Sequence, residues 1–207
     1  NKLMSFIKKL FGKKEEEVET ASNYLIATLN ERIGPLDRGE IYEDPLDEFL
    51  KSKNLGEITG GGTMQFKSGE LEYCDIEIEL LPNQINPNTI QEIITRLEEL
   101  GAPKGSKLTV EKTNEKIPFG KKEGLAIYLD GVNLDQEVYQ SCDSNIVVSE
   151  VKKLTNDTSE LVRFWEGQEE TAIYFYSDTS FSEMKNSITN FVNEYPLCKG
   201  ARIEKIA

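Results

Sequence analysis

A row of carboxylates runs along one predicted strand. In ELEYCDIEIELL (residues 70–81), Asp75, Glu77 and Glu79 alternate with apolar residues and therefore share one face of a half-buried strand. Alternate strand residues lie about 6.8 Å apart, so the outer two carboxylates are about 13 Å apart, too far for all three to hold one metal ion. We expect either a solvated strand face or a row of partner-binding residues that contacts a basic protein.

A row of tyrosines occupies the matching positions of a second predicted strand, ETAIYFYS (170–177). Tyr174 and Tyr176 should point the same way as Tyr128 of the strand GLAIYLD (124–130). Because tyrosine is enriched in interface cores, all three are candidate partner-binding residues. The alternative is that they pack between the two halves of the chain. RNA-recognition modules stack bases on such a sheet, but no RNP-type motif is present here.

Basic residues recur at two predicted helix-to-strand turns. Lys104 and Lys107 in the first half correspond to Lys199 and Arg202 in the second. They are candidates for contact with an anion or an acidic partner, although a Lys-Gly step also suits an ordinary turn after a helix. The glycine cluster GGGT (60–63) lacks a phosphate-loop lysine and a following helix, so it predicts a strand bulge or a close backbone approach.

Composition excludes several kinds of chemistry. The 207 residues include no histidine, which excludes Ser-His-Asp and Cys-His nucleophile pairs and His-ligated zinc. The cysteines Cys74, Cys142 and Cys198 are few and widely spaced, so we expect neither disulfides nor a metal, and read them as buried residues of a reducing cytoplasm. The net charge of −13 disfavours nucleic acid and favours a basic partner. No cofactor is expected.

An enzyme remains the alternative function, with its site between the two halves of the chain. Without histidine, its general acid or base would come from residues such as Asp130, Asp143, Tyr128 and Cys142. This reading requires a deep pocket between the halves that contains a buried carboxylate. A flat and filled interface would remove it.

A repeated phrase indicates how these residues are positioned. PKGSKLTV (103–110) returns as CKGARIEK (198–205), and the segments before each copy follow the same order of elements. Each half predicts strand, helix, β-hairpin, helix and strand. This β-α-β-β-α-β order resembles the ferredoxin-like fold, an antiparallel sheet with helices on one face, and the fold alone implies no function.

Local signals support the helices and strands. The helix in 86–101 has Asn86 as cap and Gly101 as stop, and the helix in 180–195 has a Ser180–Glu183 capping box. A shorter helix, DPLDEFLKS, should begin at the cap Asp44. Residues 143–155 could continue a helix or form a strand, because β-branched residues cluster there. We expect an α+β protein with a leader (1–21), a first module (22–112), a linker (113–122) and a second module (123–207).

The leader predicts a short basic amphipathic helix. Its apolar face is formed by Leu3, Phe6, Ile7, Leu10 and Phe11, and lysines fill the remaining positions. We expect it to dock on its own domain or to fray, and contact of residues 3–14 with a membrane surface is the alternative. The chain has no run of 18 apolar residues and no evident signal peptide, which favours a cytoplasmic protein.

The segment EGLAIYLDGVNLDQEVYQSCD (123–143), the paired layout and the start MSFIKKLFGKK (4–14) resemble uncharacterised bacterial cytosolic proteins. Some of those are similar to immunity proteins of polymorphic toxin systems. This resemblance implies a stoichiometric inhibitor that covers a toxin's active site with an acidic surface, and it assigns no role to any residue. The sequence therefore favours a non-catalytic protein-binding module with a basic partner, and a homodimeric structural protein is a further alternative.

Overall fold

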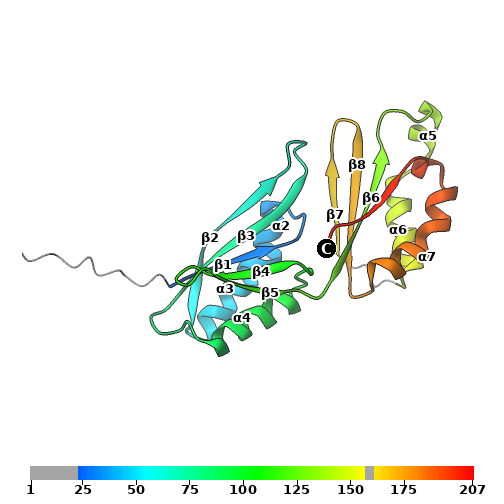
Figure 1. Cartoon of the computed structure of the whole chain (residues 1–207). Coiled ribbons are helices and arrows are strands. Elements are labelled where there is room, and N and C mark those ends of the chain that lie inside the picture. Colours follow the sequence, from blue (N-terminus) through cyan, green and yellow to red (C-terminus); the bar gives the residue numbers. More distant parts are fainter. Residues whose placement is uncertain (1–22, 157–160) are drawn as a thin grey trace, which may run out of the picture.

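The computed structural model describes residues 23–156 and 161–207. It contains two antiparallel sheets, each with helices on one face, placed so that the second sheet stands beside the first module (Figure 1). The leader and the basic segment 3–14 lie outside the described residues.

The first module is a five-stranded sheet in the order β2-β3-β1-β4-β5. Helices α3 and α4 cover one face of this sheet, and α3 follows a short helix and a π-helical turn (Figure 1). The elements in chain order are β1 (Tyr24–Leu29), α2 (Pro35–Arg38), η1 (Gly39–Glu43), α3 (Asp44–Ser52), β2 (Gly56–Gln65), β3 (Leu71–Leu80), α4 (Pro87–Glu99), β4 (Ser106–Val110) and β5 (Glu115–Phe119).

The second module is a four-stranded sheet in the order β7-β8-β6-β9, with α6 and α7 on one face (Figure 1). This order corresponds to β2-β3-β1-β4 of the first module, so the tandem ferredoxin-like α+β fold is confirmed. Its elements are β6 (Glu123–Asp130), α5 (Gln136–Ser141), α6 (Ser144–Leu154), β7 (Leu161–Glu166), β8 (Glu170–Ser177), α7 (Phe181–Glu194), η2 (Pro196–Cys198) and β9 (Arg202–Lys205).

The repeated phrase marks the same turn in both modules. Gly105 has φ of 87° just before β4, and Gly200 has φ of 79° just before β9. This left-handed conformation is readily available to glycine, which explains why each copy contains a Lys-Gly step. The predicted caps are also present: the Asn86 side chain accepts bonds from the amides of Asn88 and Thr89, and the Ser180–Glu183 capping box is complete.

Alternating strand residues build the two cores beneath the helices. In the first module Leu25, Ala27, Ile76 and Ile78 are fully buried against α3 and α4. The same positions of the second module are also buried, among them Ile127 opposite Ile173. The core side of every central strand is therefore filled as the alternation predicts.

The structure differs from the sequence prediction in two segments. Residues 113–122 were expected to be a linker, but they include β5, which pairs with β4. β5 contains Pro118 and the exposed Lys116, which an edge strand tolerates because its outer side makes no ladder bonds. The segment therefore lacks the apolar alternation that would have predicted a strand. The helix expected to start at Asp44 is instead the end of a helical run that begins at Pro35, so Asp44 is not its first cap.

The open choice at residues 143–155 is resolved as a helix. Asp143 caps α6 through a bond from the Asn145 amide, and Val147 and Val151 are buried on one helical face. No helix in the described ranges is long and apolar enough to cross a bilayer.

Candidate functional site

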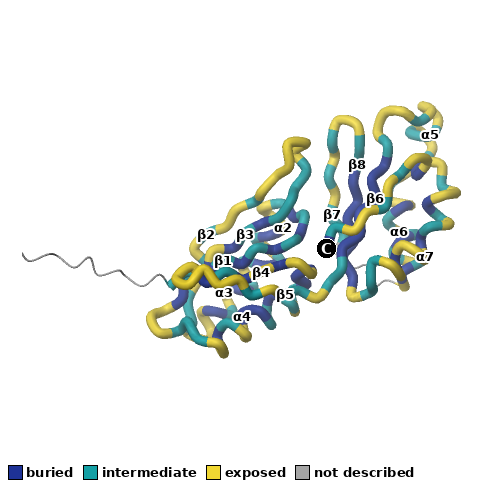
Figure 2. The backbone as a smooth tube through the Cα atoms, viewed as in Figure 1, coloured by how far each residue is buried: buried dark blue, intermediate teal, exposed yellow. Residues whose placement is uncertain are grey.

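The tyrosine row lies inside the molecule. Tyr174 and Tyr176 are fully buried and Tyr128 is 5% exposed, because the face of the second sheet that carries them packs against the first module. Figure 2 shows these strands, β6 and β8, in dark blue. The prediction that the three tyrosines contact an external partner is therefore wrong, and the alternative that they pack between the modules is correct. Their hydroxyls reach partners across this boundary.

The carboxylate of Glu70 accepts several of those hydrogen bonds. Glu70, the residue before β3, accepts hydrogen bonds of 2.7 Å from the hydroxyls of both Tyr128 and Tyr174. Arg32 donates to the same Glu70 oxygen and lies over the Tyr174 ring, 5.4 Å from its centroid. Burial raises the pKa of both tyrosines, and the bonds to Glu70 add to this effect. The hydroxyls therefore stay protonated and act as donors that join the modules.

A second buried cluster lies beside the first. Glu31 is fully buried, and Arg163 of β7 places Nη2 3.1 Å from Glu31 Oε1. The Tyr42 hydroxyl donates to Glu31 Oε2, and the Tyr176 hydroxyl accepts a 2.9 Å bond from the Arg32 amide. Burial raises the pKa of Glu31, while the Arg163 guanidinium and the Tyr42 hydroxyl act in the opposite direction. This pair ties β7 to the segment that follows β1.

A polar cavity of about 560 Å³ lies between the tip of the β2–β3 hairpin and the second sheet. Lys67 and Ser68 of the hairpin line it, together with Tyr128, Asp130 and Arg202 of the second module. Its carboxylates are not buried, because Asp130 and Glu170 are partly exposed and Glu169 is exposed. The buried carboxylate Glu31 does not line this cavity and is already occupied by Arg163 and Tyr42. This cavity therefore lacks the buried carboxylate that the enzyme reading required.

The other candidate acid–base residues have structural partners. Asp130 accepts bonds from the amides of Val132 and Asn133, which lower its pKa and close the turn after β6. Asp143 caps α6, and Cys142 is half-buried. Asp130 and Cys142 line a separate cavity of about 260 Å³, and the Tyr128 hydroxyl is bonded to Glu70 instead.

Unlike the buried tyrosine row, the carboxylate row lies on an uncovered side of the first sheet. Glu77 is exposed, Asp75 and Glu79 are half-buried, and in the described part of the chain no helix or strand covers this side of the first sheet. We call this surface the acidic sheet face. It comprises Tyr24, Ile26, Thr28, Glu57, Met64, Tyr73, Asp75, Glu77 and Glu79, and the same side of the sheet continues through Lys107 and Thr109 of β4 to Lys116 of β5. The registers Ala27–Ile76 and Ile127–Ile173 make Glu77 the counterpart of the buried Tyr174.

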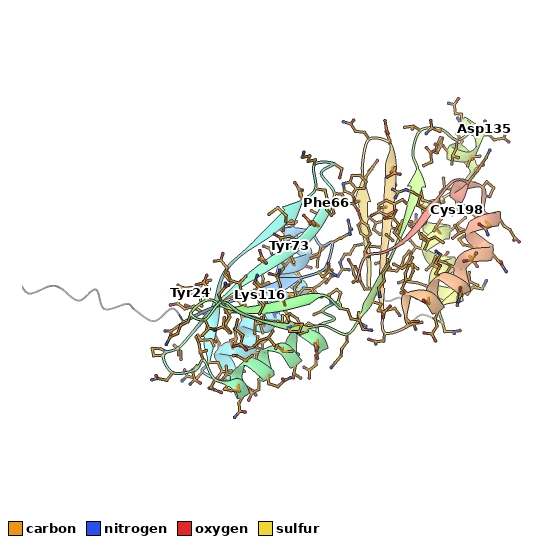
Figure 3. The ribbon with its side chains drawn as sticks, in the orientation of Figure 1. Tyr24, Phe66, Tyr73, Lys116, Asp135 and Cys198 are labelled. Atoms are coloured by element: carbon orange, nitrogen blue, oxygen red, sulfur yellow. The ribbon has the colours of Figure 1, made fainter. Side chains whose placement is uncertain are left out.

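Apolar side chains accompany the carboxylates on the acidic sheet face. Met64 is 47% exposed opposite Tyr73, and Ile26 lies between Glu77 on one side and Thr109 on the other. Figure 3 shows Tyr24 near the end where the chain enters the sheet and Tyr73 farther along toward the hairpin tip. Met64 is thus the exposed apolar residue among these three, and Ile26 and Tyr73 are half-buried between the carboxylates.

Tyr24 shows how concentrated the negative charge is. A hydrogen bond with Glu79 raises the pKa of Tyr24 most, and the charges of Glu79, Glu111 and Glu77 add to this. Glu57, which the sequence analysis missed, stands directly opposite Glu79 on β2. Its alternation was concealed because a bulge between Ile58 and Gly60 shifts the register of that strand.

The predicted close approach at the glycine cluster is present. A Cβ on Gly61 would lie 2.5 Å from Glu43 Oε1 and 2.7 Å from the carbonyl oxygen of Asp75. Arg38 uses this space to bond the Gly62 carbonyl and the Thr63 hydroxyl, at 2.8 and 2.7 Å. The cluster therefore lets the helical run pack on β2, and it does not form a phosphate cradle.

The recurrent basic residues are mostly engaged within the chain. Lys104 lies 2.7 Å from Glu123, a contact that with the Phe181 amide lowers the pKa of Glu123 to about 2. Arg202 pairs with Glu170 at 2.9 Å and also with Glu204. Lys107 and Lys199 are exposed, on β4 and in the turn before β9. As contacts for an anion or a partner, these four residues remain a prediction.

Within residues 23–156 and 161–207, no group of three or more acidic or cysteine side chains is placed to hold a metal ion. No protein-family model and no curated protein sequence matches the chain.

Solved structures show a weak likeness along most of the chain. A protein from Bacteroides thetaiotaomicron is 8% identical with a TM-score of 0.25, over 88% of this chain and 91% of that one. An unknown protein from Galdieria sulphuraria is 10% identical with a TM-score of 0.25, over 88% and 95%. The ligand-free regulatory subunit of aspartate kinase from Thermus thermophilus is 9% identical with a TM-score of 0.25, over 81% and 92%. Likeness at this level carries no statement about what the chain binds.

Proposed function

We propose that this protein is a non-catalytic protein-binding module whose acidic sheet face docks a basic protein. The observation that carries the proposal is the contrast between the two open sheet faces. The second sheet uses its open face, with Tyr174 and Tyr176, to bind the first module, whereas the equivalent face of the first sheet presents Glu77 and Glu79 outward.

Charge and shape support a basic partner. The carboxylates Glu57, Asp75, Glu77 and Glu79 lie on two neighbouring strands, so their fields add over one surface. A positively charged partner would be steered toward this surface, and contact with Ile26, Met64 and Tyr73 would then bury apolar area. Electrostatic steering raises the association rate more than the final affinity, so the rate should depend strongly on salt.

An immunity-type inhibitor is the specific form of this function that we favour. A rigid acidic surface can cover a basic active site without supplying any chemistry of its own. The buried inter-module clusters around Glu70 and Glu31 support the required rigidity, because they fix the second module against the first.

Affinity capture tests the proposal. The immobilised chain is exposed to lysate of its source organism at low and moderate salt, beside the double variant Glu77→Lys/Glu79→Lys. The matched control is Glu48→Lys/Glu99→Lys, which changes the net charge equally on exposed positions of α3 and α4, on the covered side of the same sheet. We expect a basic protein at near one-to-one stoichiometry that the first variant loses and the control retains. Retention of the chain itself alone would favour the homodimer and contradict the proposal.

A further inference from the structure

The acidic sheet face has a candidate occupant within the same chain. The described residues begin at Asn23, and β1, which follows at once, is the middle strand of the five. The leader therefore joins the sheet at the end of the acidic sheet face, beside Glu79, which pairs with Tyr24.

A groove lies beside Asn23, the first described residue, and reaches the carboxylates Glu57 and Glu79. It has a volume of about 440 Å³, and Asn23, Glu57, Glu79 and the 41%-exposed Leu81 are among its lining residues. Lys51 also lines the groove, 3.7 Å from Glu57, so the groove combines two carboxylates, one lysine and the apolar side chain of Leu81 next to Asn23.

The leader matches this surface in chemistry. Its apolar residues, from Leu3 to Phe11, recur at helical spacing, and Lys8, Lys9, Lys13 and Lys14 supply positive charge beside them. The acidic sheet face offers the complement, with Ile26, Met64 and Tyr73 set among its carboxylates.

The leader also matches in length. As a helix, residues 3–14 would be about 18 Å long at 1.5 Å per residue. The row from Tyr73 to Glu79 spans about 20 Å of strand. Residues 15–22 can extend over about 27 Å, which is enough chain to turn back and lay the helix along the row.

We infer that residues 3–14 dock on the acidic sheet face of their own chain, with the apolar side on Ile26, Met64 and Tyr73 and the lysines toward Asp75, Glu77 and Glu79. The docking itself does not depend on the proposed function. Its consequence rests on the proposed function: a basic partner must displace the leader, which acts as an internal competitor.

A spin label on the full chain tests the docking. We would place a nitroxide at Ser5→Cys in a Cys142→Ser background, since Cys74 and Cys198 are buried. Amide signals of β1 and β3 around Ile26 and Glu77 should broaden, while those on the exposed side of α4, such as Gln91, should not. Absence of broadening on the acidic sheet face would overturn the inference.

Two further experiments test whether charge drives the docking and whether the leader comes from the same chain. Glu77→Lys/Glu79→Lys in the labelled chain should abolish the broadening, whereas Glu48→Lys/Glu99→Lys should leave it unchanged. In a mixture of isotope-labelled chain and spin-labelled chain, the amide signals of the acidic sheet face should stay sharp. Broadening in that mixture would assign the face to the leader of a second copy and contradict the intramolecular docking.

The competition is tested separately with a captured basic partner. Reversing the leader's charge with Lys8→Glu/Lys9→Glu should tighten the apparent dissociation constant by roughly threefold to tenfold, if the face is free for a tenth to a third of the time. If the label shows docking and no partner is captured, the inference stands and the proposed function fails. If a partner binds wild type and Lys8→Glu/Lys9→Glu with the same dissociation constant, the competition is refuted.

Discussion

Replacing Arg163 should lower the free energy of unfolding, because the buried carboxylate Glu31 then lacks its compensating charge. The side chain of Glu31 is fully buried and that of Arg163 is 11% exposed, so the pair is shielded from solvent on both sides. Arg163→Met keeps most of the aliphatic volume but removes the charge that compensates Glu31. Breaking one side of a buried pair costs about 3–5 kcal/mol, and we expect a loss in this range at pH 8.

The loss should grow with pH. Burial already raises the pKa of Glu31, and the variant lacks the Arg163 charge that opposes the effect. A carboxyl whose pKa is raised on folding binds its proton more tightly in the folded state, so stability falls as pH rises from the ordinary carboxyl pKa through the raised one. The loss relative to wild type should therefore be larger at pH 8 than at pH 5.5.

Urea unfolding at both pH values measures this effect. The single tryptophan, Trp165, lies in the cluster of the second sheet that faces the first module and can report the transition. Lys153→Met is the control, since its exposed pair with Glu150 should contribute at most about 1 kcal/mol. The double variant Glu31→Gln/Arg163→Met should recover part of the loss. A loss below about 1 kcal/mol at pH 8, or one independent of pH, would refute the reasoning.

Gly61→Ala should destabilise the chain by about 1–3 kcal/mol in urea unfolding, because its Cβ would meet Glu43 and the Asp75 carbonyl, whereas Gly62→Ala, with nothing within 4 Å, should change little. The Glu123 carboxyl should titrate at about pH 2 by NMR, and Lys104→Met should move this pKa upward, since Lys104 is the largest cause; an unchanged value would contradict the pairing. A thiol reagent should modify half-buried Cys142 well before Cys198, which is buried and whose pKa is raised to about 11; equal rates would contradict the burial.

Signals confined to a few neighbouring residues predicted the fold well. The alternation of residues 70–81, the cap at Asn86 and the two Lys-Gly steps each depend on local backbone geometry, so one sequence suffices to read them. Strand β5 escaped prediction because an edge strand needs neither continuous apolar residues nor two sides of ladder bonds.

The inter-module contacts could be anticipated only as an alternative. Glu70 and Tyr174 are 104 positions apart, and Glu70 belongs to a charged turn that resembles any exposed hairpin. Whether a tyrosine row is exposed or buried depends on how one module sits against the other, which no local pattern encodes. The same limit applies to Glu31 and Arg163, whose pairing appears only once β7 meets the segment after β1.

The association rate of the captured basic partner tests the central claim most directly. It would be measured by stopped flow over a range of salt, with wild type, Glu77→Lys/Glu79→Lys and Glu48→Lys/Glu99→Lys. If the acidic sheet face is the binding surface, the rate falls with salt, the first variant slows it by about tenfold or more, and the control stays close to wild type. Equal slowing by both variants, or no slowing by either, would show that net charge or another surface governs binding and would contradict the account.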